Sequence, residues 1–488
     1  MTKIEDKKIA FLSRLYSITV CKGYVTYFVG GFIRDWLLNR ENSDVDITIQ
    51  GDVFEIAREI AGETAGKHVV LDAANRIARV IVTDNKTQFT VDLSELDETI
   101  ESDLAQRDFT INAIAIRLED FLSGEVNFID PIKGRNDLKK KIIRVVDPLA
   151  FQNDPIRLLR GVRLAAELNF RVDSETEELM KKNSHLIKSA AGERSRDEIL
   201  KIFALHNSSA ILRYLDRLSL LTELIPEIEE MRNVEQPKEH YWNVLEHSFE
   251  TVSTIEFLLR QKKWEYGTTR LLKEMPWSHE IESHFDEKIS YNCNRKLLLK
   301  FGGLLHDIAK PQSRSVDNAG RIRFLGHTKR GAEQTVAILS KLRFSKREIK
   351  VVETLVYYHL RPMQLANAGL PTTRAIYRYF RDTGDTGIDI LFLALADYLA
   401  ARGPYTSYKE WKQINELVRY VITEHEQQGL HRLPAKLING HDIMNIFCLT
   451  SGPLIGKLLR LVYEAQATGE ITSREDAINL IAENIHVK

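Results

Sequence analysis

The chain has 488 residues, of which 43% are hydrophobic and 28% charged, and its formal net charge is −1. This length exceeds what one core normally organises, so roughly two to four domains are expected. The composition is that of an ordinary soluble protein, and no apolar run is long enough to cross a bilayer. The first residues, MTKIEDKKIAFLSRLY, lack a signal-peptide layout, and the three cysteines lie too far apart for a disulfide framework or a zinc site. We therefore expect a cytoplasmic protein, whose neutral charge balance neither shows nor excludes a nucleic-acid partner.

Short β-rich runs alternate with helical patterns over the first 145 residues. The helical pattern is clearest at 52–66. Strands are predicted at 25–31, 44–49, 76–83, 88–94, 111–118 and 127–130. This alternation predicts an α+β or α/β domain built on one sheet.

Strand signals almost vanish from about residue 150. Residues 154–170 and 195–221 carry apolar side chains at three-four spacing, which predicts amphipathic helices. Pro226 and Pro237 bracket a charged stretch that is typical of a linker. The expected domains are a mixed domain at 1–149, a helical connecting domain at 150–238, a histidine-rich helical domain at 239–405 and a helical tail at 406–488.

Two aspartates stand out in the stretch VGGFIRDWLLNRENSDVDITI, residues 29–49. Asp44 and Asp46 are two residues apart on a predicted strand, so their carboxylates share one face. Such a pair is repulsive unless a cation binds it, and Mg²⁺ takes one or two carboxylates together with substrate phosphates. Gly30 and Gly31 predict a tight turn that exposes N–H groups to phosphate. The alternative is a surface Asp-x-Asp turn, with the glycines as punctuation.

The motif and its surroundings resemble a known family. The segment is similar to the first motif of class II tRNA nucleotidyltransferases and bacterial poly(A) polymerases, within the polymerase-β-like superfamily. Further resemblances follow in order at QRDFTINAIAI (106–116), DPIKGRNDLKKKIIRVV (130–146), FQNDPIRLLRGVRLAAELNF (151–170) and GERSRDEI (192–199). The resemblance implies an α+β fold, with an N-terminal polymerase-β-like nucleotidyltransferase head followed by all-α neck, HD and tail regions.

The resemblance also implies site residues. Asp44 and Asp46 would be the catalytic ligands of Mg²⁺. Asp108 would recognise the incoming ribose and Arg107 a phosphate, while Asp154 and Arg157 would face the incoming base in place of a template. The nucleotide-binding set is completed by Gly30, Gly31, Arg34, Asp35, Arg160 and Arg163. An ordinary helix N-cap is the alternative reading of Asp154-Pro155.

Two departures from the family pattern bear on specificity. Asn153 stands where tRNA-specific members usually have Glu before the base-reading Asp. CCA-adding members usually also carry a flexible arm, tied to switching from CTP to ATP, where this chain runs directly from QFTVDLS into the next motif. This favours an enzyme that adds only CC or only A, or a poly(A) polymerase. Near that gap, Asp92 is expected either to be a third active-site carboxylate or to cap a turn.

The second half resembles the HD phosphohydrolase superfamily. Histidine and aspartate recur on separate predicted helices, with an adjacent His-Asp pair in LLHDIAKP. The expected ligands are His247, His306, Asp307, His327, His359 and Asp397. Imidazole with carboxylate suits Mn²⁺, Ni²⁺ or Fe²⁺ with positions left for water, and Lys310 is positioned in sequence to steady a phosphate.

Together these patterns predict an RNA enzyme with two catalytic sites. The head would transfer CMP or AMP, or both, from CTP or ATP to the tRNA acceptor end, and the HD region would add a phosphohydrolase-like site. One rival is a poly(A) polymerase that tails many RNAs. The other is an HD phosphohydrolase whose N-terminal region only binds nucleotide or RNA. No membrane partner is expected, and the oligomeric state stays open.

Overall fold

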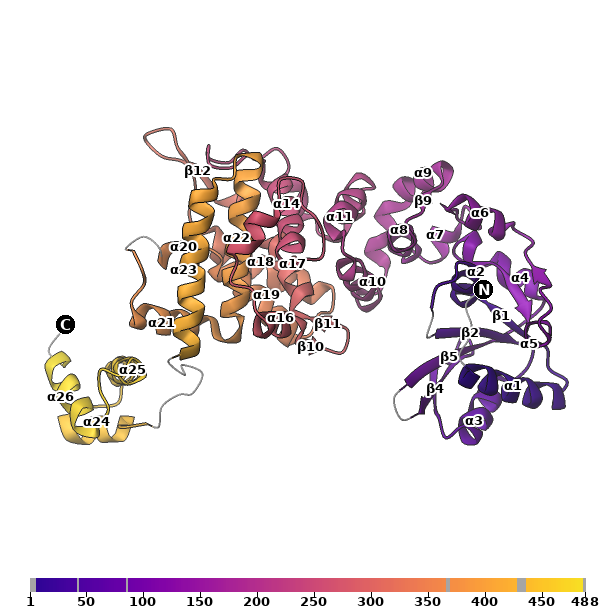
Figure 1. Ribbon diagram of the computed structural model, residues 1–488, viewed down its shortest axis with the longest axis horizontal. Coiled ribbons are helices and arrows are strands. Elements are labelled where there is room, and N and C mark those ends of the chain that lie inside the picture. The colour runs from indigo at the N-terminus through magenta and orange to yellow at the C-terminus, as the bar shows by residue number, and fades with distance from the viewer. Residues whose placement is uncertain (1–5, 42–43, 85–86, 366–368, 428–435, 486–488) are drawn as a thin grey trace. The chain divides into compact units, whose positions relative to one another are not determined.

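The computed structural model of the protein describes residues 6–41, 44–84, 87–365, 369–427 and 436–485. The chain divides into two compact units (Figure 1). Unit 1 comprises Met1–Glu198 with Tyr214–Leu224, and unit 2 comprises Ile199–Arg213 with Ile225–Lys488. The expected α+β fold, a mixed head followed by helical regions, is confirmed. No helix of the described ranges is both long and apolar enough to span a membrane.

Seven strands of unit 1 form one sheet in the order β3-β4-β5-β2-β1-β6-β7. Their bounds are β1 Thr26–Val29, β2 Asp44–Ile49, β3 Lys67–Asp72, β4 Ile77–Asp84, β5 Thr87–Glu95, β6 Ala115–Arg117 and β7 Phe128–Ile129. β2 and β5 run parallel, which places Asp46 opposite Asp92. Strand β3 was missed by sequence reasoning, because this edge strand exposes Val69, Val70 and Leu71 rather than alternating them with polar residues.

The helices of unit 1 cover this sheet and continue past it. Their bounds are α1 Asp6–Cys21, α2 Gly30–Leu37, α3 Val53–Glu63, α4 Ile100–Ala105, α5 Leu118–Ser123, α6 Gly134–Lys140, α7 Ala150–Asn153, α8 Arg157–Leu168, α9 Ser174–Asn183, α10 Gly192–Ala204 (shared with unit 2) and α12 Leu220–Leu224. Two short strands, β8 Ile142–Ile143 before α7 and β9 Arg171–Val172 after α8, pair in parallel. Helix α3 begins where the Asp52 carboxylate accepts hydrogen bonds from the N–H groups of Phe54 and Glu55, a cap worth about 1 kcal/mol.

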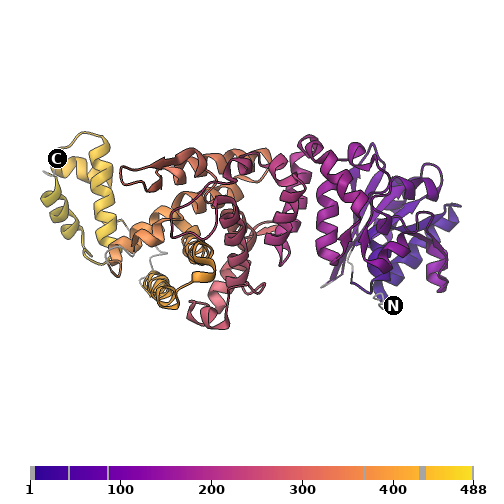
Figure 2. The same ribbon diagram turned by 90° about the horizontal axis from the view of Figure 1, so that it is seen from above.

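Unit 2 is almost entirely helical. Its helices are α11 Ser208–Arg217 (shared with unit 1), α13 Glu227–Met231, α14 Val244–Leu258, α15 Thr269–Glu274, α16 His279–Asp286, α17 Arg295–Leu305, α18 His327–Lys341, α19 Lys346–Tyr358, α20 Arg361–Leu365, α21 Thr373–Thr383, α22 Gly387–Arg402 and α23 Tyr408–Gln427. Helices α14 and α22 are buried on nearly every face, because they pack against each other and against α17, and α22 also contacts α19. The pair α22–α23 is seen from the side in Figure 1 and end-on in Figure 2.

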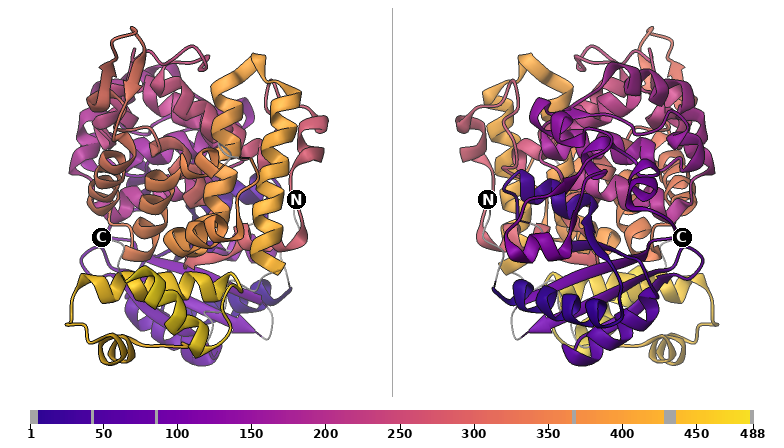
Figure 3. Two further views of the ribbon diagram at one scale, coloured as in Figure 1. Left: turned by 90° about the vertical axis from the view of Figure 1, so that its left-hand side faces the viewer. Right: turned by 90° about the vertical axis from the view of Figure 1, so that its right-hand side faces the viewer.

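Two short hairpins interrupt these helices. β10 Lys288–Ser290 pairs with β11 Cys293–Asn294, and β12 Arg314–Val316 pairs with β13 Ile322–Phe324. The β12–β13 hairpin and the turn between α22 and α23 lie at the same end of the helical body (Figures 1 and 3).

The C-terminal helices form their own small core. They are α24 Gly440–Phe447, α25 Pro453–Ala467 and α26 Arg474–Asn484, and they enclose residues such as Ile443, Val462 and Ile481. The buried carboxylate of Glu464 on α25 pairs with Arg374 at 3.3 Å and with Arg378 at 2.5 Å, both on α21.

Candidate active sites

Three carboxylates lie on the two parallel strands at the centre of the head sheet. Asp44 and Asp46 come from β2 and Asp92 from β5, directly opposite Asp46. Burial raises the pKa of Asp46, the nearby Asp92 and Asp44 raise it further, and Arg107 and Arg160 oppose the rise. Asp92 lies inside a strand and lines the cavity, which excludes the turn-cap reading and favours the third-carboxylate reading.

The two glycines bring the backbone close to these carboxylates. The Gly31 N–H donates to Oδ2 of Asp46 at 3.1 Å. Gly30 has a positive φ of 69°, and a Cβ there would lie 2.8 Å from a guanidinium nitrogen of Arg107 and 3.1 Å from Oδ2 of Asp46. The start of α2 therefore leaves room for no side chain on this side of the cavity.

Arg34 and Asp35 are buried behind the cavity rather than lining it. Arg34 donates to both carboxylate oxygens of Asp35, at 2.9 and 2.8 Å, and to the Asn112 amide oxygen at 2.9 Å. The Asn112 amide nitrogen in turn donates to Asp108 at 3.0 Å. This pair thus holds a wall of the cavity in place.

Asp108 is held in its ionised form. Burial would raise the pKa of its carboxyl, but Arg160 and hydrogen bonds from Asn112 and the Phe109 N–H outweigh burial and lower it. The Arg160 Nε lies 2.6 Å from Oδ2 of Asp108. A carboxylate in this position can accept hydrogen bonds from ligand hydroxyl groups.

Asp154 and Arg157 line the same cavity but do not share a helix. Helix α7 ends at Asn153, Asp154 has an extended backbone, and α8 begins at Arg157. The N-cap reading of Asp154 is wrong, because its carboxylate instead accepts hydrogen bonds from Arg194 at 2.9 and 2.8 Å. The Arg157 guanidinium donates to the backbone carbonyl of Gln106 at 2.9 Å.

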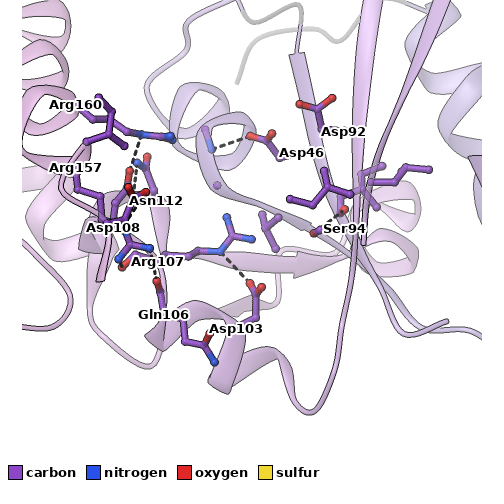
Figure 4. Close-up of a pocket in the computed structure, with 18 residues that line it drawn as sticks. Asp46, Asp92, Ser94, Asp103, Gln106, Arg107, Asp108, Asn112, Arg157 and Arg160 are labelled. Carbon is purple, nitrogen blue, oxygen red and sulfur yellow. Dashed lines mark hydrogen bonds and ion pairs between the residues drawn. The ribbon is translucent and has the colours of Figure 1, made fainter. Parts of the chain in front are cut away.

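One cavity of about 420 Å³ is lined by Asp46, Asp92, Arg107, Asp108, Asp154, Arg157 and Arg160 (Figure 4). Asp44 does not line it: its exposed carboxylate lies at the start of β2 and accepts a hydrogen bond from the Thr90 hydroxyl at 2.5 Å. Arg163 is not part of the cavity lining either; it pairs with Glu198 at 2.6 Å and with Glu167 at 2.5 Å. Sequence reasoning missed Asp103, which holds Arg107 at 2.9 Å. It also missed Arg79, which donates twice to Asp92 at 2.7 Å. The Asp103–Arg107 pair has i,i+4 spacing, which a sequence can suggest. The Arg79–Asp92 pair depends on the register of β4 against β5.

A second cluster lies in unit 2 and contains the six expected HD residues. His247 comes from α14, His327 begins α18 and Asp397 comes from α22; the remaining three follow the ends of α17 and α19: His306, Asp307 and His359. Asp307 is shared by two groups, one with His247 and His306 and one with His327 and His359, each with ligand atoms within 4.8 Å of one another. Asp397 joins the first group, with Oδ1 2.9 Å from the His247 Nε2.

Backbone carbonyls orient three of these imidazoles. The Nδ1 atoms of His306, His327 and His359 lie 2.9, 2.7 and 2.8 Å from the carbonyl oxygens three residues earlier. A carbonyl only accepts, so each Nδ1 carries a proton, and in the neutral ring each Nε2 offers its unshared pair to the cluster. Burial lowers the pKa of His359 to about 3, which keeps that ring neutral.

The two donor sets fit different metal ions. The head offers carboxylate oxygens alone, the hard ligands that Mg²⁺ prefers. The HD cluster offers buried imidazoles around a carboxylate whose pKa is lowered, a set that suits a transition metal such as Mn²⁺, Ni²⁺ or Fe²⁺. Burial also lowers the pKa of His247 and His327, whereas at His306 burial is outweighed by Asp307, which raises the pKa of that ring. Lys310 lies 2.6 Å from Oδ2 of Asp307 and donates to Gln236 at 2.6 Å, which places a cation at the edge of this cluster.

The fold and the head carboxylates define a polymerase-β-like nucleotidyltransferase with an appended HD region. Residues 26–144 match the Poly A polymerase head domain, 169–232 the probable RNA and SrmB-binding site of polymerase A, and 244–402 the HD domain. The fold is shared with a CCA-adding enzyme in its apo form (TM-score 0.65, 20% identity, 99% of this chain and 96% of that one). It is also shared with the Thermotoga maritima CCA-adding enzyme complexed with tRNA (TM-score 0.58, 21% identity, 99% and 97%).

Among curated proteins, the A-adding tRNA nucleotidyltransferase of Deinococcus radiodurans is 30% identical, over 92% of this chain and 93% of that protein. The CC-adding tRNA nucleotidyltransferase of Thermus thermophilus is 29% identical, over 92% and 91%. The chain belongs to the tRNA nucleotidyltransferase family. This confirms the predicted enzyme class over a poly(A) polymerase or a sensor attached to an HD hydrolase.

Proposed function

We propose that this enzyme transfers CMP from CTP to the 3′ end of tRNA, adds two C residues and stops. The full-length relatives include both A-adding and CC-adding enzymes at nearly equal identity, so overall similarity does not decide the step. The observation that carries the proposal is the connection between β5 and α4.

This connection consists of residues 96–99 only, because β5 ends at Glu95 and α4 begins at Ile100. Both of its ends are fixed. The Leu96 N–H donates to the Ile49 carbonyl at 2.8 Å and its side chain is buried, while the Thr99 hydroxyl accepts from the Ser102 N–H at 3.2 Å to cap α4. A four-residue link fixed at both ends leaves no room for the flexible arm that the family ties to switching from CTP to ATP. An enzyme that begins with CTP would then keep to CTP, and the experiment below separates this outcome from addition of A alone.

The cavity supports a role for each of its polar side chains. Asp154 and Arg157 together offer acceptors and donors to the Watson–Crick edge of a base. Asp108 would accept from ribose hydroxyls, and Arg107 beside Gly30 would contact phosphate. Asp44 and Asp46 would hold Mg²⁺, with Asp92 beside them, and the bound ion would lower the pKa of the attacking hydroxyl and offset charge on the phosphates.

The experiment is nucleotide addition with Mg²⁺ to three tRNAs: one that ends before CCA, one that ends in C and one that ends in CC. CTP and ATP are supplied separately and together, and products are resolved at single-nucleotide length. We expect two C residues on the first tRNA, one on the second and none on the third, with ATP unused. Addition of A to the third tRNA, complete CCA or an A ladder would each contradict CC addition.

For the HD cluster we propose a metal-dependent phosphohydrolase that acts on a nucleotide phosphate ester. The observation that supports this proposal is the set of Nε2 atoms that face the shared Asp307 carboxylate, with Lys310 at the edge of the cluster. A metal held there would supply an activated water, and Lys310 would steady the phosphate. The test is hydrolysis of adenosine 2′,3′-cyclic phosphate by the full chain loaded with Mn²⁺ or Ni²⁺. Activity that persists in a His306→Ala variant would contradict this assignment.

A further inference from the structure

Unit 2 contains a cavity of about 270 Å³ beside the HD cluster, and none of the functions proposed above uses it. Two segments build it, and it is named the tyrosine pocket after its two aromatic side chains. Its lining is Lys238, Glu239, His240 and Tyr241 from one segment and Ala401, Arg402, Tyr405, Ser407 and Glu410 from the other.

The two segments are fixed to each other. The Tyr241 N–H donates to the Ala401 carbonyl at 2.8 Å. Gly403 has a positive φ of 53°, and a Cβ there would lie 3.4 Å from both Tyr241 and Trp242. The positive φ of Gly403 sets the turn that leads to Tyr405, and the Tyr241–Ala401 hydrogen bond holds the two segments together, so the pocket is a preformed feature of the fold.

The pocket offers aromatic surface that is accessible to a ligand. Tyr405 is 76% exposed and Tyr241 48% exposed, although most large apolar side chains of this unit are buried. Their rings meet edge to face with centroids 5.6 Å apart, which leaves ring faces uncovered. Such faces stack on any nucleobase. The lining carries two basic and two acidic side chains, and this balance suits a base better than a phosphate.

The pocket adjoins the HD cluster through two elements. Ala401 lies four residues after Asp397 on α22, which is one helical turn or about 6 Å along the axis. The ring of His240, part of the pocket wall, lies 5.3 Å from the ring of His247. Both separations are comparable with the length of a ribose, so one nucleotide could place its base in the pocket and its phosphate at the cluster.

We propose that the tyrosine pocket binds the nucleobase of a nucleotide whose ribose 2′- or 3′-phosphate reaches the HD cluster. This inference rests on the proposed phosphohydrolase and deepens it, because it makes the site select nucleotides over other phosphate esters. Tyr405 supplies the main stacking face, and Tyr241 holds it from the side. Stacking does not read base edges, so all four bases are accepted.

The test compares two cyclic phosphodiesters: adenosine 2′,3′-cyclic phosphate and glycerol 1,2-cyclic phosphate, which lacks a base. The metal-loaded full chain is assayed as wild type, Tyr405→Ala, Tyr405→Trp and Tyr291→Ala. Tyr291 is a matched control, since it is 89% exposed in the β10–β11 turn. We expect Tyr405→Ala to reduce kcat/KM for the nucleotide about tenfold or more, mainly through KM. Hydrolysis of the glycerol ester by Tyr405→Ala should remain near wild type, and Tyr291→Ala should match the wild type on both esters. Tyr405→Trp, which keeps a stacking face, should restore nucleotide hydrolysis relative to Tyr405→Ala.

Equal rates for the nucleotide in wild type and Tyr405→Ala would overturn the inference and leave the phosphohydrolase standing. Equal losses on both esters would also overturn it, because the change would then be structural. If the wild type hydrolyses neither ester, the phosphohydrolase itself fails. The pocket is then judged by equilibrium binding of adenosine 2′-monophosphate. Any binding of the nucleotide by the head is the same in the wild type and in Tyr405→Ala. Weaker binding by Tyr405→Ala would therefore support the pocket, and identical binding would overturn the inference.

Discussion

Arg194 fixes both carboxylate oxygens of Asp154, with its Nη1 and Nη2 atoms 2.9 and 2.8 Å from Oδ1 and Oδ2. A two-point contact of this kind sets the plane of the carboxylate as well as its position. Asp154 has an extended backbone outside both neighbouring helices, and Arg194 is its two-point contact, while the Arg157 Nε lies farther away, 4.0 Å from Oδ2. The proposed reading of the base therefore depends on a side chain that does not line the cavity.

We expect Arg194→Ala to impair nucleotide choice more than nucleotide binding. Loss of orientation at a reacting site costs up to about 10²-fold in rate, so CTP incorporation should fall and the ratio of CTP to ATP or UTP incorporation should narrow. Single-nucleotide addition to a tRNA that ends before CCA measures both the rate of CTP incorporation and this ratio. Arg196→Ala is the control, since Arg196 pairs with Asp197 on the same helix. Unchanged selectivity in Arg194→Ala would remove Asp154 from base reading.

The head carboxylates give a second prediction. Asp46→Asn should reduce nucleotide transfer by at least about 10²-fold, because charge on the transferring phosphate loses its main stabilisation. Asp92→Asn should also reduce transfer, since Asp92 lies opposite Asp46 in the adjacent strand. Glu98→Gln, at an exposed position of the 96–99 link, should have no effect. Transfer assays with Mg²⁺ check this, and hydrolysis by the HD region should be unchanged in all three variants.

The head motifs could be predicted from the sequence because their residues lie close together along the chain. Asp44 and Asp46 lie on one strand, and the Gly30-Gly31 pair lies one helix earlier, so local geometry already brings them together. The register of β2 against β5, which pairs Asp46 with Asp92, is a long-range property that no spacing reveals. Tertiary packing also explains why the sequence did not predict the positions of Arg34 and Asp35, which were expected to shape the phosphate site. Their residue types fit that chemistry, but packing buries them behind the wall.

The HD region illustrates the opposite case. Its ligands are scattered over 151 residues, from His247 to Asp397, and only the adjacent His306-Asp307 pair is local. Resemblance to a family, rather than spacing, supplied the rest. The tyrosine pocket had no sequence signal, because Tyr241 and Tyr405 belong to segments that meet only through the fold.

A buried ion pair in unit 2 gives a stability prediction. The Lys300 Nζ lies 3.1 Å from Glu256 and donates to the carbonyls of Phe203 and Leu205, and neither Lys300 nor Glu256 is exposed. Glu256→Gln leaves the buried ammonium unpaired and should lower the free energy of unfolding by about 3–5 kcal/mol. Denaturant titration measures this. Glu265→Gln, on an exposed segment, should change it by less than about 0.5 kcal/mol.

The same pair predicts a pH dependence. Burial lowers the pKa of Lys300 from its ordinary value of 10.5, and Glu256 only partly opposes this. Between the folded and unfolded pKa values the unfolded chain binds more protons at Lys300, so this residue makes the free energy of unfolding rise with pH in that window. The slope should be smaller in Lys300→Met. An identical slope in both proteins would show that Lys300 does not titrate differently in the folded state.

The shared carboxylate of the HD cluster makes the last prediction. Oδ2 of Asp307 lies 3.6 and 3.1 Å from the Nε2 atoms of His247 and His306, while Oδ1 lies 3.5 and 3.8 Å from those of His327 and His359. One carboxylate thus faces two half-sites, and up to two ions should bind. Asp307→Asn should abolish tight Mn²⁺ binding, whereas His359→Ala should remove one ion and keep the other.

Isothermal titration of the full chain with Mn²⁺ counts these ions, and transfer to tRNA with Mg²⁺ should stay at the wild-type rate in both variants. His441→Ala, on an exposed position of the tail, is the matched control for loss of an imidazole. Equal stoichiometry in the wild type and His359→Ala would mean that the second half-site holds no ion. In that case His327 and His359 would act as polar groups that position substrate beside a single metal.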